Sequence, residues 1–176
     1  MRLGVDIGGV IIQPVDQLYP AGPAEGHAET DTSLLADVGR TPPMPGVFEA
    51  LATLVDRVFG AHVHLVSKCG ERVERRTREW LAYHDFHSRT GIDPGNVHFC
   101  RTRQAKAPIA AALGLTHFVD DRLEVLSYLE TVPHRFLFRP REPEVRAHRE
   151  HLATVRRVES WPELVTCLVP AAGADG

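Results

Sequence analysis

Short apolar segments alternate along the chain with longer amphipathic segments, and this alternation limits the possible folds more than any other feature. Residues 2–12 are expected to form a buried strand and a turn, and the other expected strands are 62–67, 97–100, 116–121 and 135–138, with a further strand near 155–159. Apolar residues recur at helical spacing in 47–59, 71–86, 104–115, 122–130 and 160–168, and a charged helix is expected between 138 and 155. Strands that alternate with helices build parallel sheets. We therefore expect an α/β fold: a three-layer, Rossmann-like parallel sheet with helices on both faces.

The chain length favours one domain. With 176 residues it is long enough for one hydrophobic core and short for two. We expect residues 1–170 to form this domain. Residues 13–45 are rich in Pro, Gly and acidic residues, so we expect a loop or a minimal lid there, and a frayed tail at 171–176.

Composition excludes several classes of partner. The net charge of −3 offers no basic patch for nucleic acids and no polybasic segment for membranes. No apolar run approaches the roughly 18 residues of a spanning helix, and the N-terminus does not resemble a signal peptide. The three cysteines are far apart and give neither a disulfide framework nor a zinc site. We therefore expect a protein of the reducing cytoplasm.

Polar residues follow several of the expected strands at the point where each strand ends. They are Asp6, Ser67 and the pair Asp120 and Asp121. Ligands of parallel sheets bind at the carboxyl ends of the strands, so these side chains should converge. Three carboxylates repel one another unless a cation lies among them, and an all-oxygen set suits Mg²⁺.

The two lysines and two glycines extend this group. The 20 basic residues comprise 18 arginines and only two lysines, Lys68 and Lys106. A lysine neutralises a phosphoryl group in transfer as a compact point charge, and a serine hydroxyl donates to its oxygens. Gly8 and Gly9 allow the backbone to approach a phosphate closely. Together the residues indicate phosphoryl transfer through a carboxylate nucleophile.

Four motifs in order resemble those of the haloacid dehalogenase-like hydrolase superfamily. They cover most of the chain, from about residue 2 to residue 168, and the stretches PMPGVFEAL and SWPEL are also similar to the family. The motifs are VDIGG with Asp6, HLVSK with Ser67, QAKAPIAAALGL with Lys106, and FVDDR with Asp120 and Asp121.

The resemblance implies an aspartate nucleophile and a magnesium cofactor. Asp6 would attack a phosphoryl group, and Ser67 and Lys106 would hold its oxygens. Gly8, Gly9 and Lys68 would lie against the same group. Mg²⁺ would be held by Asp6, the carbonyl of Gly8, and Asp120 or Asp121. The intervals between the motifs leave no room for a large cap domain, so the substrate would be a small phosphorylated metabolite or a phosphorylated macromolecule.

Gly8 departs from the family pattern, which has a second aspartate at this position. That aspartate is the general acid and base, whose help is worth roughly 10²–10⁴-fold. A weakly active phosphatase, for example a nucleotidase-like one, is therefore one hypothesis. A non-catalytic or regulatory phosphate-binding protein is the alternative. Asp16, Glu25 or His27 would be available as a replacement acid.

Other interpretations remain open. The stretch GVDIGG also resembles the phosphate loop of actin-fold sugar kinases, although Val10 stands where that class has Thr or Ser. Cleavage of carbon–halogen or carbon–phosphorus bonds at the same site is a further alternative. Lys106 would ordinarily be solvated in a first helical turn, so its replacement by alanine should change stability by less than about 0.5 kcal/mol.

Overall fold

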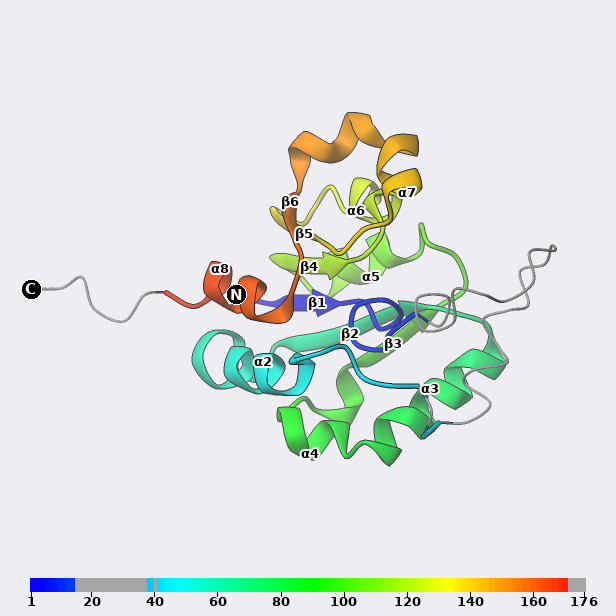
Figure 1. The fold of residues 1–176 in the computed structure, drawn as a ribbon, viewed down its shortest axis with the longest axis vertical. Helices are drawn as coiled ribbons and strands as arrows, with labels where there is room; N and C mark the ends of the chain where they lie inside the picture. The colour runs from blue at the N-terminus through cyan, green and yellow to red at the C-terminus, as the bar shows by residue number, and fades with distance from the viewer. Residues whose placement is uncertain (15–37, 40, 171–176) are drawn as a thin grey trace, which may run out of the picture.

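The computed structural model describes residues 1–14, 38–39 and 41–170. Its centre is a six-stranded, all-parallel sheet in the order β3-β2-β1-β4-β5-β6, which confirms the expected parallel sheet (Figure 1). The strands are β1 Leu3–Val5, β2 Val63–Lys68, β3 Val97–Cys100, β4 His117–Asp120, β5 His134–Phe138 and β6 Arg156–Val158. The sixth strand lies where the sequence suggested it.

Helices cover both faces of this sheet, as expected for a three-layer Rossmann-like fold. One core joins α2, α3, α4 and α8 to the sheet, and a second core joins α5, α6 and α7 to its other face (Figure 1). The helices are α2 Val47–Leu54, α3 Glu71–Tyr83, α4 Phe86–Thr90, α5 Lys106–Ala112, α6 Leu123–Tyr128, α7 Glu142–Ala147 and α8 Trp161–Leu168. A π-helical turn, η1 Val55–Phe59, and two 3₁₀ turns, η2 Pro94–Asn96 and η3 Arg149–Thr154, complete the elements.

The single helix expected over residues 71–86 is two helices in the structure. Between α3 and α4, Asp85 has a φ of 50°, a left-handed conformation that aspartate tolerates better than most residues. Trp80 and Phe86 both pack against Phe48 of α2, with ring centroids 6.4 and 6.0 Å away. Six residues apart on one straight helix, these two rings would point in very different directions. The turn lets both reach the core.

The two ends of the segment between β1 and α2 are joined by backbone hydrogen bonds. The amide of Gln13 donates to Pro42 O, and the amide of Met44 donates to Ile11 O at 2.7 Å. Residues 15–37 and 40, most of the expected loop or lid, lie outside the described residues, as does the expected tail at 171–176. The described ranges contain no large cap domain. They also contain no helix that is long and apolar enough to cross a membrane.

Candidate functional site

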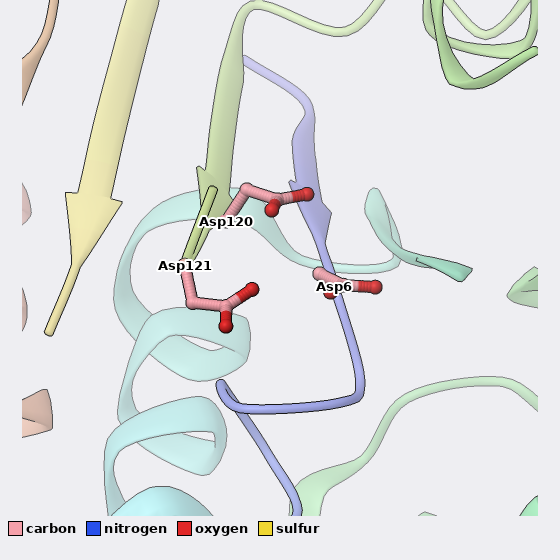
Figure 2. Close-up of side chains that lie close together, drawn as sticks. All are labelled: Asp6, Asp120 and Asp121. Atoms are coloured by element: carbon pink, nitrogen blue, oxygen red, sulfur yellow. The ribbon is translucent and has the colours of Figure 1, made fainter. Parts of the chain in front are cut away.

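The carboxyl ends of β1 and β4 bring three aspartates together. The two strands are paired with Val5 opposite Val119, and the amide of Asp6 donates to Val119 O at 2.9 Å. Asp6 follows β1, and Asp120 and Asp121 lie at the end of β4 (Figure 2). One carboxylate oxygen from each lies within 4.8 Å of the others. The predicted convergence of these acids is therefore present in the structure.

Lys106 lies between two of these carboxylates. Its Nζ is 2.8 Å from Asp6 Oδ1 and 2.8 Å from Asp120 Oδ2. The lysine is only 2% exposed, so the expectation of a solvated side chain was wrong. Burial by itself lowers the pKa of Lys106, but the charges of Asp120 and Asp6 more than offset this and hold the pKa above its usual value.

Gly4 and Phe118 lie next to each other in the sheet, and the ring of Phe118 faces Lys106. A Cβ on Gly4 would lie 2.4 Å from the ring of Phe118, so only glycine fits beside this ring in the sheet. The ring centroid of Phe118 lies 5.8 Å from the Nζ of Lys106. The apolar ring of Phe118 keeps water from the ammonium group of Lys106 and so strengthens the attraction of this group to the carboxylates. Neither residue was identified from the sequence, in which Gly4 within an apolar strand was the available signal.

The negative charge of the cluster is only partly balanced. Burial raises the pKa of Asp120 to about 6, despite the nearby Lys106. Burial, together with the charges of Asp120 and Asp6, raises the pKa of Asp121 to about 8. Both shifts have the direction expected for crowded carboxylates that lack a neutralising cation. The donor atoms are all oxygens, and the cluster carries more negative charge than Lys106 balances. Both properties suit a hard divalent cation such as Mg²⁺.

The two carboxyl groups of β4 differ in their hydrogen bonds. Asp120 Oδ2 accepts from Lys106, and Asp120 Oδ1 accepts from the backbone amide of Arg122 at 3.0 Å. The amide of Arg122 was not identified from the sequence. The carboxylate of Asp121 accepts from no donor in the described part of the chain, so its oxygens remain available to a ligand.

The adjacent glycines after β1 occupy very different environments. Gly9 has a φ of 78°, and a Cβ there would lie 2.6 Å from Asp121 Oδ2. Glycine is therefore required at position 9, both for the backbone conformation and for space. Gly8 lies outside the left-handed region, and a Cβ there would meet no described atom within 4 Å. Gly8 is exposed, and a side chain at position 8 would find open space.

Ser67 and Lys68 end the neighbouring strand β2. Ser67 is 8% exposed, and its hydroxyl has no hydrogen-bond partner within the described ranges. Lys68 is exposed and has no acidic partner there. Both lie at the same edge of the sheet as the aspartates, but no hydrogen bond or ion pair joins them to the cluster. Asp16, Glu25 and His27, the suggested replacement acids, lie outside the described residues.

The cysteine beside the site is unsuited to be a nucleophile. Cys69 is buried, and burial together with the charge of Glu74 raises the pKa of its thiol to about 11. A thiol with this pKa is protonated near neutral pH, whereas the thiolate is the reactive form. Asp6 therefore remains the nucleophile candidate.

Comparison with known proteins gives information about the fold. No protein-family model matches the sequence, and no curated protein matches it significantly. A conserved haloacid dehalogenase-like protein of unknown function from Agrobacterium tumefaciens strain C58 aligns with 94% of this chain and 96% of its own, at 10% identity and a TM-score of 0.59. A de novo designed Rossmann 3x3 fold protein aligns with 100% of this chain and 98% of its own, at 10% identity and a TM-score of 0.44. The first likeness, together with the observed sheet, shows that the chain has a haloacid dehalogenase-like α/β fold, and this fold carries a buried cluster of three aspartates.

Proposed function

We propose that the protein is a Mg²⁺-dependent phosphoryl hydrolase in which Asp6 is the nucleophile. One observation carries the proposal: a buried lysine lies 2.8 Å from both Asp6 and Asp120 at the carboxyl edge of a parallel sheet. A carboxylate held in this way is oriented for attack, as a nucleophile must be.

The free oxygen of Asp6 would attack the phosphorus atom, and the bond from phosphorus to the leaving-group oxygen would break with its electron pair departing on that oxygen. Water would then hydrolyse the aspartyl phosphate, releasing phosphate and restoring the Asp6 carboxylate. Lys106 keeps the attacking carboxylate in place and faces the negative charge that develops on the phosphoryl oxygens. Ser67 would donate its hydroxyl hydrogen to one of these oxygens, and the backbone of Gly8 and Gly9 would lie against the group. Lys68 would add a positive charge from the end of β2.

The bound Mg²⁺ would neutralise charge on the phosphoryl oxygens. Asp6, Asp121 and the carbonyl oxygen of Gly8 would hold it, and Asp120 would hold Lys106 instead. This division follows from the hydrogen bonds, because both oxygens of Asp120 already accept from the protein. The oxygens of Asp121 accept from no described donor.

A second candidate function rests on Gly8. Without an acid at this position, the site would bind a phosphorylated ligand and turn it over slowly or not at all, as a regulatory protein does. Under either function we propose a small phosphorylated metabolite or a phosphorylated macromolecule as the partner, in the cytoplasm.

The test is a screen for phosphate release with and without Mg²⁺. The substrates are sugar phosphates, nucleotides, acyl phosphates and phosphopeptides, and the control is Asp6→Asn. The hydrolase predicts release that requires both Mg²⁺ and Asp6. Binding of phosphorylated ligands by calorimetry without any release would favour the regulatory function. Release that survives in Asp6→Asn would refute the proposed nucleophile.

A further inference from the structure

We propose that the substrate contains a phosphoric anhydride, two or more phosphoryl groups in a chain, as in a nucleoside diphosphate. This inference rests on the proposed function and narrows its substrate class. Two features point to it: the open position at Gly8 and a set of three cations at the same edge of the sheet. We call these cations, Lys68, Arg122 and Arg139, the cationic rim.

The lack of an acidic side chain at Gly8 limits which leaving groups the site can expel. Cleavage of an alkyl phosphate expels an alkoxide, whose conjugate acid is about as weak as water with its pKa of about 16. Such a group needs a proton as it departs, and position 8 offers no acid. A leaving phosphate is far less basic, because the second pKa of a phosphate ester is about 6. It departs as a stable anion without help.

The cationic rim lies at the edge of the sheet where the substrate would bind. Lys68 ends β2, Arg122 follows Asp121 at the end of β4, and Arg139 follows β5. Because all strands are parallel, these ends share the edge that carries the aspartates. None of the three has an acidic partner within residues 1–14, 38–39 and 41–170.

The arginines that follow β3 at the same edge are different. Arg101 pairs with Glu74 at 2.9 Å, and Arg103 pairs with Glu124 at 2.6 Å. Their charges are therefore balanced within the protein. The rim cations are available to an anion.

Arg139 reaches from β5 toward the turn after Asp6. Its Nη1 is 3.2 Å from Met44 Sδ, and the amide of Met44 donates to Ile11 O in that turn. The backbone of Arg139 has a φ of 41°, a conformation uncommon for residues other than glycine. The guanidinium thus lies against the sulfur of Met44, and it has no acidic partner in the described part of the chain.

The balance of charge favours a polyanion. With a divalent cation bound, the charges of this ion and of Lys106 balance the three ionised carboxylates. The rim then adds three positive charges at the edge of the sheet where the substrate would bind. A phosphate monoester carries about −1.5 to −2 at neutral pH, and a second phosphoryl group adds negative charge that the rim can neutralise.

The reaction balances without an added acid. An Asp6 oxygen forms a bond to the terminal phosphorus, the bond from this phosphorus to the bridging oxygen breaks, and the electron pair leaves with the second phosphate. Water then attacks the phosphorus of the aspartyl phosphate, and the electron pair of the broken bond returns to the carboxylate. One proton of the water stays on the released phosphate, and the other passes to solvent.

Three substrates distinguish the effect of a good leaving group from the effect of a second phosphoryl group at the cationic rim. Pyrophosphate has a good leaving group and a second phosphoryl group, p-nitrophenyl phosphate has only the good leaving group, and glycerol phosphate has neither. We expect kcat/KM to be highest for pyrophosphate and at least about 100-fold lower for glycerol phosphate than for p-nitrophenyl phosphate. Equal rates on glycerol phosphate and pyrophosphate would overturn the inference and leave the proposed function standing. Failure of all three substrates would count against the proposed function itself.

The rim is tested by a triple variant, Lys68→Ala/Arg122→Ala/Arg139→Ala. We expect its kcat/KM for pyrophosphate to fall more than about tenfold further than that for p-nitrophenyl phosphate, since each cation contributes up to about 1 kcal/mol. The matched control, Arg101→Ala/Arg103→Ala, removes paired charges from the same edge and should change the ratio of the two substrates less than about threefold. Equal losses on both substrates in the triple variant would refute the role of the rim.

A binding measurement gives a readout apart from turnover. In the Asp6→Asn background, calorimetry should show pyrophosphate binding at least about tenfold more tightly than orthophosphate. The triple rim variant should cancel this difference. Equal affinity for the two anions in Asp6→Asn would overturn the inference.

Discussion

Replacement of Lys106 by methionine tests the electrostatics of the site directly. Methionine keeps most of the apolar length of the side chain and removes only its charge and hydrogen bonds. The three carboxylates then lose the one ammonium group that contacts Asp6 and Asp120. Removing one partner of a buried ion pair typically costs about 3–5 kcal/mol. We expect a loss of this size at pH 8 without Mg²⁺, far above the 0.5 kcal/mol suggested by a solvated lysine.

The cost should depend on pH. Burial, together with the neighbouring carboxylates, raises the pKa of Asp120 to about 6 and that of Asp121 to about 8, even with the lysine present. Without Lys106 these groups hold protons more tightly still, so at pH 5 both are neutral in the folded variant. The uncompensated charge is then smaller, and we expect Lys106→Met to cost less than about 2 kcal/mol at pH 5.

Urea denaturation at the two pH values, with Mg²⁺ removed, measures these differences. The matched control is Lys68→Met, which changes the other lysine of the chain at an exposed position. It should alter stability by less than about 0.5 kcal/mol at either pH. A similar loss for both variants, or a loss for Lys106→Met that is equal at pH 5 and pH 8, would refute the view that Lys106 neutralises buried carboxylates.

Other predictions follow from the same geometry. Gly9→Ala should cost about 1–3 kcal/mol in thermal denaturation, because its φ is 78° and the new methyl group meets Asp121; an unchanged midpoint would contradict this. Asp121 has a raised pKa in the folded state, so its contribution to stability falls as pH rises from about 4 to about 8. Asp121→Asn should accordingly gain stability relative to wild type over this range without Mg²⁺, and a constant difference would count against the shift. Burial, with the neighbouring charge of His134, lowers the pKa of His117 to about 4, so the unfolded chain takes up the proton first as pH falls below 6.5. His117→Gln should therefore lose less stability than wild type between pH 6.5 and pH 4, by up to roughly 3 kcal/mol; parallel pH profiles would refute it. In calorimetry, Asp121→Asn should weaken Mg²⁺ binding more than Asp120→Asn, and the reverse order would contradict the proposed division between the two acids.

The sheet and the convergence of the acids could be predicted from the sequence because both follow from local patterns. Alternation of apolar and amphipathic segments indicates parallel strands, and parallel strands end at one edge. Asp6 and Asp121 directly follow a strand and Asp120 ends one, so their approach required no knowledge of the helices. The comparison that gives the fold adds no information about these side chains, since only 10% of residues are identical.

The burial of Lys106 could not be predicted in the same way. The sequence places it at the start of a helix, where lysine side chains usually reach solvent. Its burial depends on how α5 packs against the sheet and on the register of β1 with β4, which are properties of the assembled fold. The break after α3 is similar, because the charged pattern continues through it and only the packing of Trp80 and Phe86 requires the turn at Asp85.

Residue identity alone does not distinguish the roles of Gly8 and Gly9. Gly8 and Gly9 are equivalent in the sequence, and either could serve to let the backbone approach a phosphate. In the structure only Gly9 is constrained, by its left-handed backbone and by the carboxylate of Asp121 against it. Gly8 accepts a side chain on steric grounds, so space does not account for the lack of an acid there. This distinction connects Gly8 to the leaving group of the proposed substrate.

The choice of lysine at position 106, in a chain that otherwise uses arginine, has a physical explanation in the structure. A single Nζ lies 2.8 Å from oxygens of two different residues, in a space that leaves the side chain 2% exposed. An ammonium group directs its three donors from one point, whereas the guanidinium group of arginine is a wide planar fork suited to one carboxylate at a time. An arginine here would overfill the space above Phe118 and could not centre its charge between Asp6 and Asp120. The same reasoning does not extend to Lys68, which is exposed and makes no contact that arginine could not make. The scarcity of lysine in the sequence therefore carries structural information at position 106, where the group is buried between two carboxylates.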